Sequence, residues 1–348
     1  QKYNYIDNSW SSLTGVTIGI TLPDPNDPWN PIVVKEQAVD VDGKVSITLT
    51  DVNVYTVGIK EDYYFPSYAL TVTAPSGGGG GGSTQNTFNI SKAVNFLLSK
   101  QSLDGSFGSS LYTDWVVIAA AAAQNSSLKN SLSSYLLSNP LNSALLTDNE
   151  RHAMALMALG INPYSGTSVN YITKVVSAFD GTQFGDSSLT NDDIFALIVL
   201  KNAGYTSSDE IIKKAASYII SKQDSSGSWG SVDMTAAGIQ ALRNFIDLPE
   251  TSSSISKAEN YLKNSQLSNG GFGNSSSTSW ALQVLPQSNQ ISNADNYVAS
   301  LQQTDGGLDP TTDPQDSRVW STAYAIVGAL HMSWNSIMQS FSKQVTQP

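Results

Sequence analysis

Hydrophobic positions follow two different periods along this chain, and a run of six consecutive glycines at 77–82 separates them. Before the glycines, apolar and polar residues alternate, as in the run from Val16 to Leu22, with similar runs at 45–49, 55–59 and 70–72. A period of two predicts strands that bury one face. Asp42-Gly43 lies between two of these runs and is typical of a hairpin turn. The pattern predicts about five short antiparallel strands within residues 1–75.

A small antiparallel β-sandwich is the expected result, and it would resemble the immunoglobulin-like or prealbumin-like modules of surface proteins. Residues 76–87 are expected to form a linker, because glycine loses more conformational freedom on ordering than any other residue. One cluster before the linker is rich in aromatic residues and is either a binding patch or part of the strand core: Asp62, Tyr63, Tyr64, Phe65 and Tyr68.

After the linker a unit recurs, in which a glycine-rich turn joins an amphipathic helix to a more apolar one. The turn at 101–108 consists of Gln, three residues, Gly, one residue, an aromatic residue and Gly. It returns at 223–230 and 266–273, and at 302–308 a leucine replaces the aromatic residue. A degenerate copy lies at 179–185.

The spacing of the turns predicts the number of units. Phe184, Trp229 and Phe272 are 45 and 43 residues apart, whereas Phe107 and Phe184 are 77 residues apart, nearly twice that spacing. A further copy without the turn must therefore lie around 136–159, which makes six units. Because one hairpin cannot cover its own apolar face, six hairpins that stack and close would form an all-α (α/α)6 barrel at residues 88–348.

The glycine-rich turn resembles the QW motif of squalene–hopene cyclases, so the chain is similar to the prenyltransferase/squalene-oxidase repeat family. The resemblance spans about 88–334 and implies the toroid, but a shared fold does not fix a reaction. Triterpene cyclases of this family protonate their substrate with an Asp-x-Asp-Asp acid, and the nearest string here, Thr190-Asn191-Asp192-Asp193, lacks the first Asp. Protein prenyltransferases hold zinc with Asp, Cys and His, and this chain has no cysteine.

The apolar helices begin with polar or aromatic residues that would converge at one mouth of the barrel. The acids would suit a cation or a sugar, and the indoles would offer stacking surfaces. The candidate ligand-binding residues are Asp114, Trp115, Asp192, Asp193, Asp233, Trp280, Arg318 and Trp320. Helix capping is the alternative interpretation of Asp192 and Asp193. No catalytic residue and no metal ligand is predicted, and His152 and His331 are expected to be structural.

The composition limits the classes of partner that the protein is expected to bind. Charged residues make up 14% of the chain, the net charge is −11, and cysteine is absent. Nucleic acid is not expected as a partner, because phosphate binding needs clustered Lys and Arg. Disulfides and thiolate metal sites are excluded, whereas an acidic surface suits cations, with calcium as the candidate. No apolar stretch reaches the length of a membrane span.

The uncharged polar surface and the start at Gln1 favour a secreted protein whose leader has been removed, hence an extracellular or cell-surface location. Because the family's catalytic residues are largely missing, we expect a non-catalytic protein whose toroid is a scaffold for an unknown small molecule, glycan or protein partner. One alternative is a subunit of an extracellular filament or surface layer that assembles through its β-domain. The other alternative is an enzyme that processes a terpenoid or glycan inside the barrel.

Overall fold

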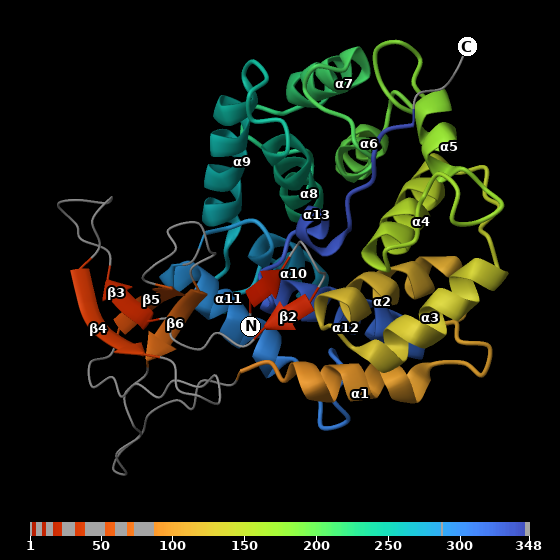
Figure 1. Cartoon of the computed structure of the whole chain (residues 1–348). Coiled ribbons are helices and arrows are strands. Elements are labelled where there is room, and N and C mark those ends of the chain that lie inside the picture. Colours follow the sequence, from red (N-terminus) through yellow and green to blue (C-terminus); the bar gives the residue numbers. More distant parts are fainter. Residues whose placement is uncertain are drawn as a thin grey trace. The chain divides into compact units, whose positions relative to one another are not determined.

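The computed structural model describes residues 87–286 and 288–344 and the strand segments 2–4, 9–11, 17–22, 32–38, 53–59 and 68–72. The chain divides into two compact units, 1–83 and 84–348. In the first unit, four strands form an antiparallel sheet in the order β4-β3-β5-β6 (Figure 1): β3 (Thr17–Leu22), β4 (Ile32–Ala38), β5 (Asn53–Ile59) and β6 (Tyr68–Val72). β1 (Lys2–Asn4) and β2 (Ser9–Ser11) pair as a two-stranded sheet.

The predicted β-sandwich is not seen among the described strands, which form one four-stranded sheet and one two-stranded sheet. β4 was not predicted, because Ile32, Val33 and Val34 are consecutive apolar residues and break the alternation. The predicted strand at 45–49, the turn at Asp42-Gly43 and the aromatic cluster at 62–65 lie outside the described residues.

The second unit is a closed ring of helical hairpins, as predicted (Figure 1). The inner helices are α2 (Ser110–Ala122), α4 (Leu146–Ala158), α6 (Thr190–Asn202), α8 (Val232–Arg243), α10 (Ser275–Leu282) and α12 (Gln315–Ala329). Each inner helix packs on the next, and α12 packs on α2, which closes the ring. The outer helices are α1 (Ile90–Lys100), α3 (Ser126–Ser138), α5 (Tyr171–Ser177), α7 (Glu210–Ser221), α9 (Thr251–Ser265) and α11 (Asn289–Ser300).

The glycine-rich turns hold neighbouring hairpins together. The first glycine of each full copy has φ between +87° and +92°, and a Cβ there would lie 2.3–3.2 Å from a carbonyl oxygen of a neighbouring outer helix, so only glycine fits. The Gln of the turn also reaches that helix, as the Gln223 side chain does when it donates to the carbonyl oxygen of Ser254 (2.9 Å). The last turn reaches the first helix, because the Gln302 side chain bonds both backbone groups of Asn89. The repeat therefore closes on itself.

After α12 the chain folds back onto the ring. α13 (Trp334–Ile337) packs against α2 and α6, and the following residues cross the ends of two inner helices. The N–H of Gln339 donates to the carbonyl oxygen of Met157 on α4, and the N–H of Phe341 donates to that of Asn202 on α6. We call residues 333–341 the C-terminal strap. It covers the end of the barrel where the inner helices finish, and we call the end where they begin the mouth.

No helix in the part of the chain that the structure describes combines the length and the apolar character that a bilayer crossing requires.

Candidate functional site

Each glycine-rich turn is fixed to its inner helix at one repeated position. The N–H of the turn's aromatic or leucine residue donates to a threonine hydroxyl, at 2.8–3.2 Å, in four units: Phe107 to Thr113, Trp229 to Thr235, Phe272 to Thr278, and Leu308 to Thr322. In the degenerate unit the N–H of Phe184 donates to the Asp193 carboxylate at 2.8 Å. Asp193 therefore replaces the threonine of the repeat and adds a second oxygen, Oδ2, which has no partner among the described residues.

Aromatic side chains gather inside the barrel two residues beyond this turn-binding position. The ring centroid of Trp115 lies 4.9 Å from that of Tyr324, 6.0 Å from Trp280 and 6.4 Å from Phe195. Trp334, from the C-terminal strap, lies 4.8 Å from Trp280. These five rings come from α2, α6, α10, α12 and α13, and we call them the aromatic floor.

Nearer the mouth, three side chains of the inner helices are partly exposed: Tyr112 on α2, Asp233 on α8 and Trp320 on α12. The Trp320 ring lies 5.8 Å from Tyr112 and 5.7 Å from Tyr324, so it extends the aromatic surface outward from the floor. Asp233 Oδ1 is a buried atom without a hydrogen-bond partner in the described part of the protein. Buried polar atoms are usually paired, so this oxygen is available to a ligand.

Three carboxyl groups form an acid cluster on α4 and α6. Glu150 is fully buried, and neither of its oxygens has a partner within the described residues. Burial, and then the charges of Asp192 and Asp193, raise the pKa of Glu150 well above its ordinary value. Burial also raises the pKa of Asp193 to about 7, against the lowering effect of the Phe184 N–H. Burial therefore favours the protonated form of these acids.

Asp192 completes the acid cluster and meets a glycine that admits no side chain. Its Oδ2 accepts the N–H of Asp186 at 3.0 Å, and burial raises its pKa. A Cβ on Gly185 would lie 2.1 Å from this oxygen and 2.9 Å from Leu146 Cδ2. Asp192 and Asp193 lie in the first turn of α6, but the N-cap is Leu189, so neither acid is the N-cap.

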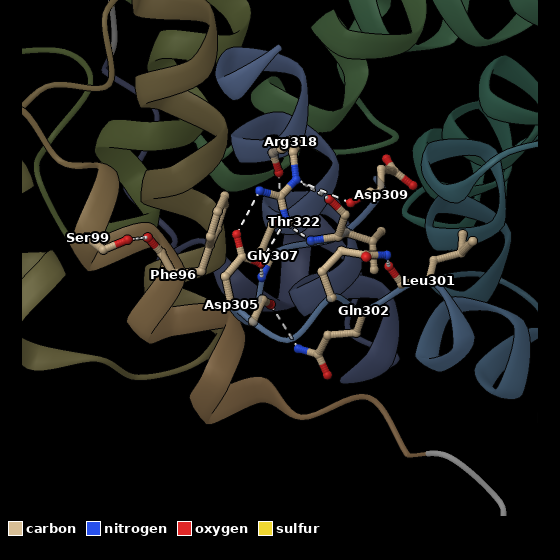
Figure 2. Close-up of polar contacts among 12 residues, drawn as sticks. Phe96, Ser99, Leu301, Gln302, Asp305, Gly307, Asp309, Arg318 and Thr322 are labelled. Carbon is tan, nitrogen blue, oxygen red and sulfur yellow. Dashed lines mark hydrogen bonds and ion pairs between the residues drawn. The ribbon is translucent and has the colours of Figure 1, made fainter. Parts of the chain in front are cut away.

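Arg318, which was predicted to bind a ligand, forms its polar contacts with other residues of the protein (Figure 2). Its two terminal nitrogens each lie 2.8 Å from an oxygen of Asp305, and its Nε donates to the carbonyl oxygens of Leu308 and Asp309. The guanidinium also stacks over Phe96 of α1 at 4.8 Å. Arg318 thus joins the last turn of the ring to the first outer helix.

Asp114, another predicted ligand residue, is also engaged. It is fully buried, accepts from Arg151 Nε at 3.3 Å and pairs with His152 Nδ1 at 3.0 Å, so it ties α2 to α4. Its position in a buried ion pair, and not at the mouth, differs from the prediction. The other ring nitrogen of His152, Nε2, is buried and has no hydrogen-bond partner among the described residues.

The structure brings the other six predicted residues into the floor, the mouth and the acid cluster: Trp115 and Trp280, Asp233 and Trp320, Asp192 and Asp193. Glu150, Phe195, Tyr324 and Trp334 were not predicted as site residues. Aligning the inner helices on the turn-binding position would have found Phe195 and Tyr324, whereas Glu150 lies in the unit without the turn. Trp334 lies outside the repeat, so no periodic signal identifies it.

No group of three or more His, Asp or Glu residues in the described part of the chain could hold a metal ion. A calcium site is therefore not assigned.

No protein-family model and no curated protein sequence matches this chain. Solved structures do match. The type II terpene cyclase MstE from Scytonema matches with a TM-score of 0.53 and 13% identity, over 69% of this chain and 96% of the cyclase. A variant of it in complex with its substrate, geranylgeranyl dihydroxybenzoate, matches with a TM-score of 0.53, 12% identity, and coverage of 72% and 97%. A variant in complex with its product, merosterolic acid A, matches with a TM-score of 0.51 and 14% identity, over 70% of this chain and 95% of the cyclase. At this identity the likeness shows the fold alone.

These comparisons contradict the expectation of a non-catalytic scaffold. The neighbours are enzymes of the same toroidal fold, with substrate or product bound, and nearly their whole length matches this chain. The absence of the complete Asp-x-Asp-Asp string was therefore too weak a reason to exclude catalysis. The neighbours give no support to the expected immunoglobulin-like module or extracellular assembly, and the extracellular or cell-surface location stays a prediction.

Proposed function

We propose that this protein is a terpenoid-processing enzyme that protonates an isoprenoid substrate inside the toroid and so starts its cyclisation or rearrangement. The observation that carries the proposal is the acid cluster of Glu150, Asp192 and Asp193, whose two aspartates lie on α6, the helix that also carries Phe195 of the aromatic floor.

Protonation of an alkene requires an acid that keeps its proton at the working pH and that lies away from water. Burial works towards both conditions, because it keeps water away and, by disfavouring the charged carboxylate, raises the pKa values of all three acids. The resulting carbocation needs stabilisation without a nucleophile. The faces of Trp115, Phe195 and Trp280 can provide it, since a cation is attracted to the π-system of an aromatic ring.

The missing first Asp of the family motif has a substitute in this arrangement. Asp192 and Asp193 match the last two positions of Asp-x-Asp-Asp, and Glu150 adds a carboxyl group from the neighbouring helix α4. The neighbouring charges raise the pKa of Glu150, as the like charge of a further Asp would.

The test is turnover of linear polyprenyl alcohols and prenylated aromatic acids, with products identified by mass spectrometry. Glu150→Gln and Asp192→Asn keep the shape of the side chain and are expected to lower turnover by about 10²–10⁴-fold, the usual contribution of a general acid. Asp224→Asn removes an exposed turn acid and is the control. Wild-type turnover in the Glu150→Gln/Asp192→Asn double variant would contradict the proposal.

A further inference from the structure

We propose that Asp192 acts through Glu150: it takes up protons from solvent and passes them to Glu150, which donates them to the substrate. Asp192 is then a positioning residue for the proton, and Glu150 is the catalytic acid. The inference rests on the proposed function, because it divides the roles within the same acid cluster.

Glu150 is the member of the acid cluster whose two oxygens are both available. Its side chain is fully buried, and neither Oε1 nor Oε2 has a partner among the described residues. By contrast, Asp193 Oδ1 accepts the Phe184 N–H at 2.8 Å, and Asp192 Oδ2 accepts the Asp186 N–H at 3.0 Å. A general acid has to direct its O–H at the reacting atom, so Glu150 fits the role of donor best.

Asp192 lies against a surface loop. Residues 185–189 are all exposed, whereas Asp192 itself is 6% exposed. The N–H of Asp186 joins the Asp192 carboxyl group to this loop, and a Cβ on Gly185 would lie 2.1 Å from the same carboxyl oxygen. Asp192 Oδ2 therefore adjoins a segment of the chain that solvent reaches.

Asp192 is also coupled to Glu150 on the neighbouring helix. Burial is the main cause of the raised pKa of Glu150, and the charge of Asp192 comes next, ahead of that of Asp193. Burial raises the pKa of Asp192 as well, but Glu150 is the more deeply buried of the two. Glu150 therefore binds a proton more tightly than Asp192, and a proton on Asp192 moves towards an ionised Glu150.

The protons of one turnover balance within these groups and solvent. Glu150 gives its proton to the alkene and becomes a carboxylate. The Asp192 carboxylic acid then transfers its proton to that carboxylate, directly or through one water, and regains a proton from solvent at the exposed loop. The proton that the cation loses when the product forms returns to solvent. The first turnover thus needs only Glu150, whereas every later turnover needs Asp192 too.

The test compares the rate of the first turnover with the steady-state rate. Both are measured on the full chain by rapid quenching and mass spectrometry, with the polyprenyl alcohol or prenylated aromatic acid that wild type converts fastest. In Asp192→Asn the first turnover is expected to stay within about threefold of wild type, while the steady-state rate falls by about 10²-fold or more. In Glu150→Gln both rates are expected to fall by about 10²–10⁴-fold. A variant that merely folds poorly would lower both rates together.

Gly185→Ala and Gly181→Ala are a matched pair that keeps all three acids. Both glycines have a positive φ, +62° and +103°, so alanine strains the backbone at either position. Only the Cβ at Gly185 meets Asp192, because no atom lies within 4 Å of a Cβ on Gly181. Gly185→Ala is expected to lower the steady-state rate selectively, as Asp192→Asn does, and Gly181→Ala to keep the wild-type ratio of the two rates.

Two results would overturn the inference. If Asp192→Asn lowers the first turnover as much as the steady-state rate, Asp192 is itself the donor. If it leaves both rates at the wild-type level, protons reach Glu150 by another route. A wild-type protein that forms no product even in the first turnover would instead contradict the proposed function, and this inference with it.

Discussion

Two sets of polar side chains in the barrel, the amides under the C-terminal strap and two acids towards the mouth, are partnered in opposite ways. At the end covered by the C-terminal strap, the amides of Asn202, Asn244 and Asn335 are paired with one another and with backbone carbonyls. Towards the mouth, Glu150 and Asp233 carry buried oxygens without a partner in the described part of the protein. An unpaired buried polar group destabilises a fold by about 1–3 kcal/mol, so its retention points to function. The amides under the strap are thus paired, whereas these acids towards the mouth are the ones to which we assign the proposed chemistry.

Breaking the paired end is expected to have the largest effect on stability. Asn202→Ala leaves the Asn335 amide and the carbonyl oxygens of Asn335 and Met338 buried without their partner. We expect a loss of about 2–4 kcal/mol in the free energy of unfolding, measured with urea. Asn139→Ala, which removes an exposed amide that bonds only Tyr135, is expected to change it by less than about 0.5 kcal/mol. Equal effects of the two substitutions would remove the contrast between the ends.

The raised pKa values of the acid cluster predict that the protein becomes more stable as the pH falls. Glu150 and Asp193 have pKa values that are raised in the folded state above the unfolded values of 4.5 and 3.8. Their contribution to stability is therefore fully present below the unfolded pKa values. It is lost as the pH rises towards and through the folded pKa values, and that of Asp193 is about 7. The melting temperature should therefore rise by several degrees when the pH falls from 8 to about 5. In Glu150→Gln/Asp193→Thr that rise should largely disappear. A rise of the same size in the double variant would assign it to other groups.

Substitutions of Asp193 test its structural role, which is to accept the Phe184 N–H, apart from its role as an acid. Asp193→Ala removes the acceptor of the Phe184 N–H and is expected to lower the free energy of unfolding by about 1–2 kcal/mol. Asp193→Thr restores the hydroxyl that four other units use at this position, so its stability at pH 7 should equal or exceed that of wild type. Thermal unfolding of both variants checks this, and a threonine variant as unstable as the alanine variant would show that the repeat is not equivalent here.

The smallest effect concerns two exposed leucines at the mouth. Leu145 and Leu189 are the N-caps of α4 and α6, the helices that carry the acid cluster, and neither makes a capping hydrogen bond. Ser231 at the N-cap of α8 does make one. Leu145→Ser and Leu189→Ser should each stabilise the protein by about 0.5–1 kcal/mol, as seen in thermal unfolding, and Ser231→Leu should destabilise it similarly. A loss of stability in both serine variants would mean that the leucines pack against the protein.

Much of the toroid could be predicted because its signals are local and repeat along the chain. The turn positions have a positive φ and lie close to a neighbouring helix, and both conditions favour glycine. They therefore show in the sequence as Gly at a fixed interval. The aromatic residues at the starts of the inner helices could be predicted because they also recur with the repeat. The predicted β-sandwich had no such repeat, and consecutive apolar residues hid β4.

The sequence by itself determined the six hairpins, their closure and the positions from which side chains enter the barrel, because helix periodicity and turn chemistry depend on neighbouring residues. Only the tertiary structure decided which of those side chains remain free. Arg318 and Asp114 form ion pairs with residues 13 and 37 positions away, whereas neither oxygen of Glu150 has a partner among the residues that the structure describes. Trp334 reaches the floor only because the strap folds back across the ring. Burial and pairing depend on contacts between distant segments, and these contacts set the pKa values of the acids.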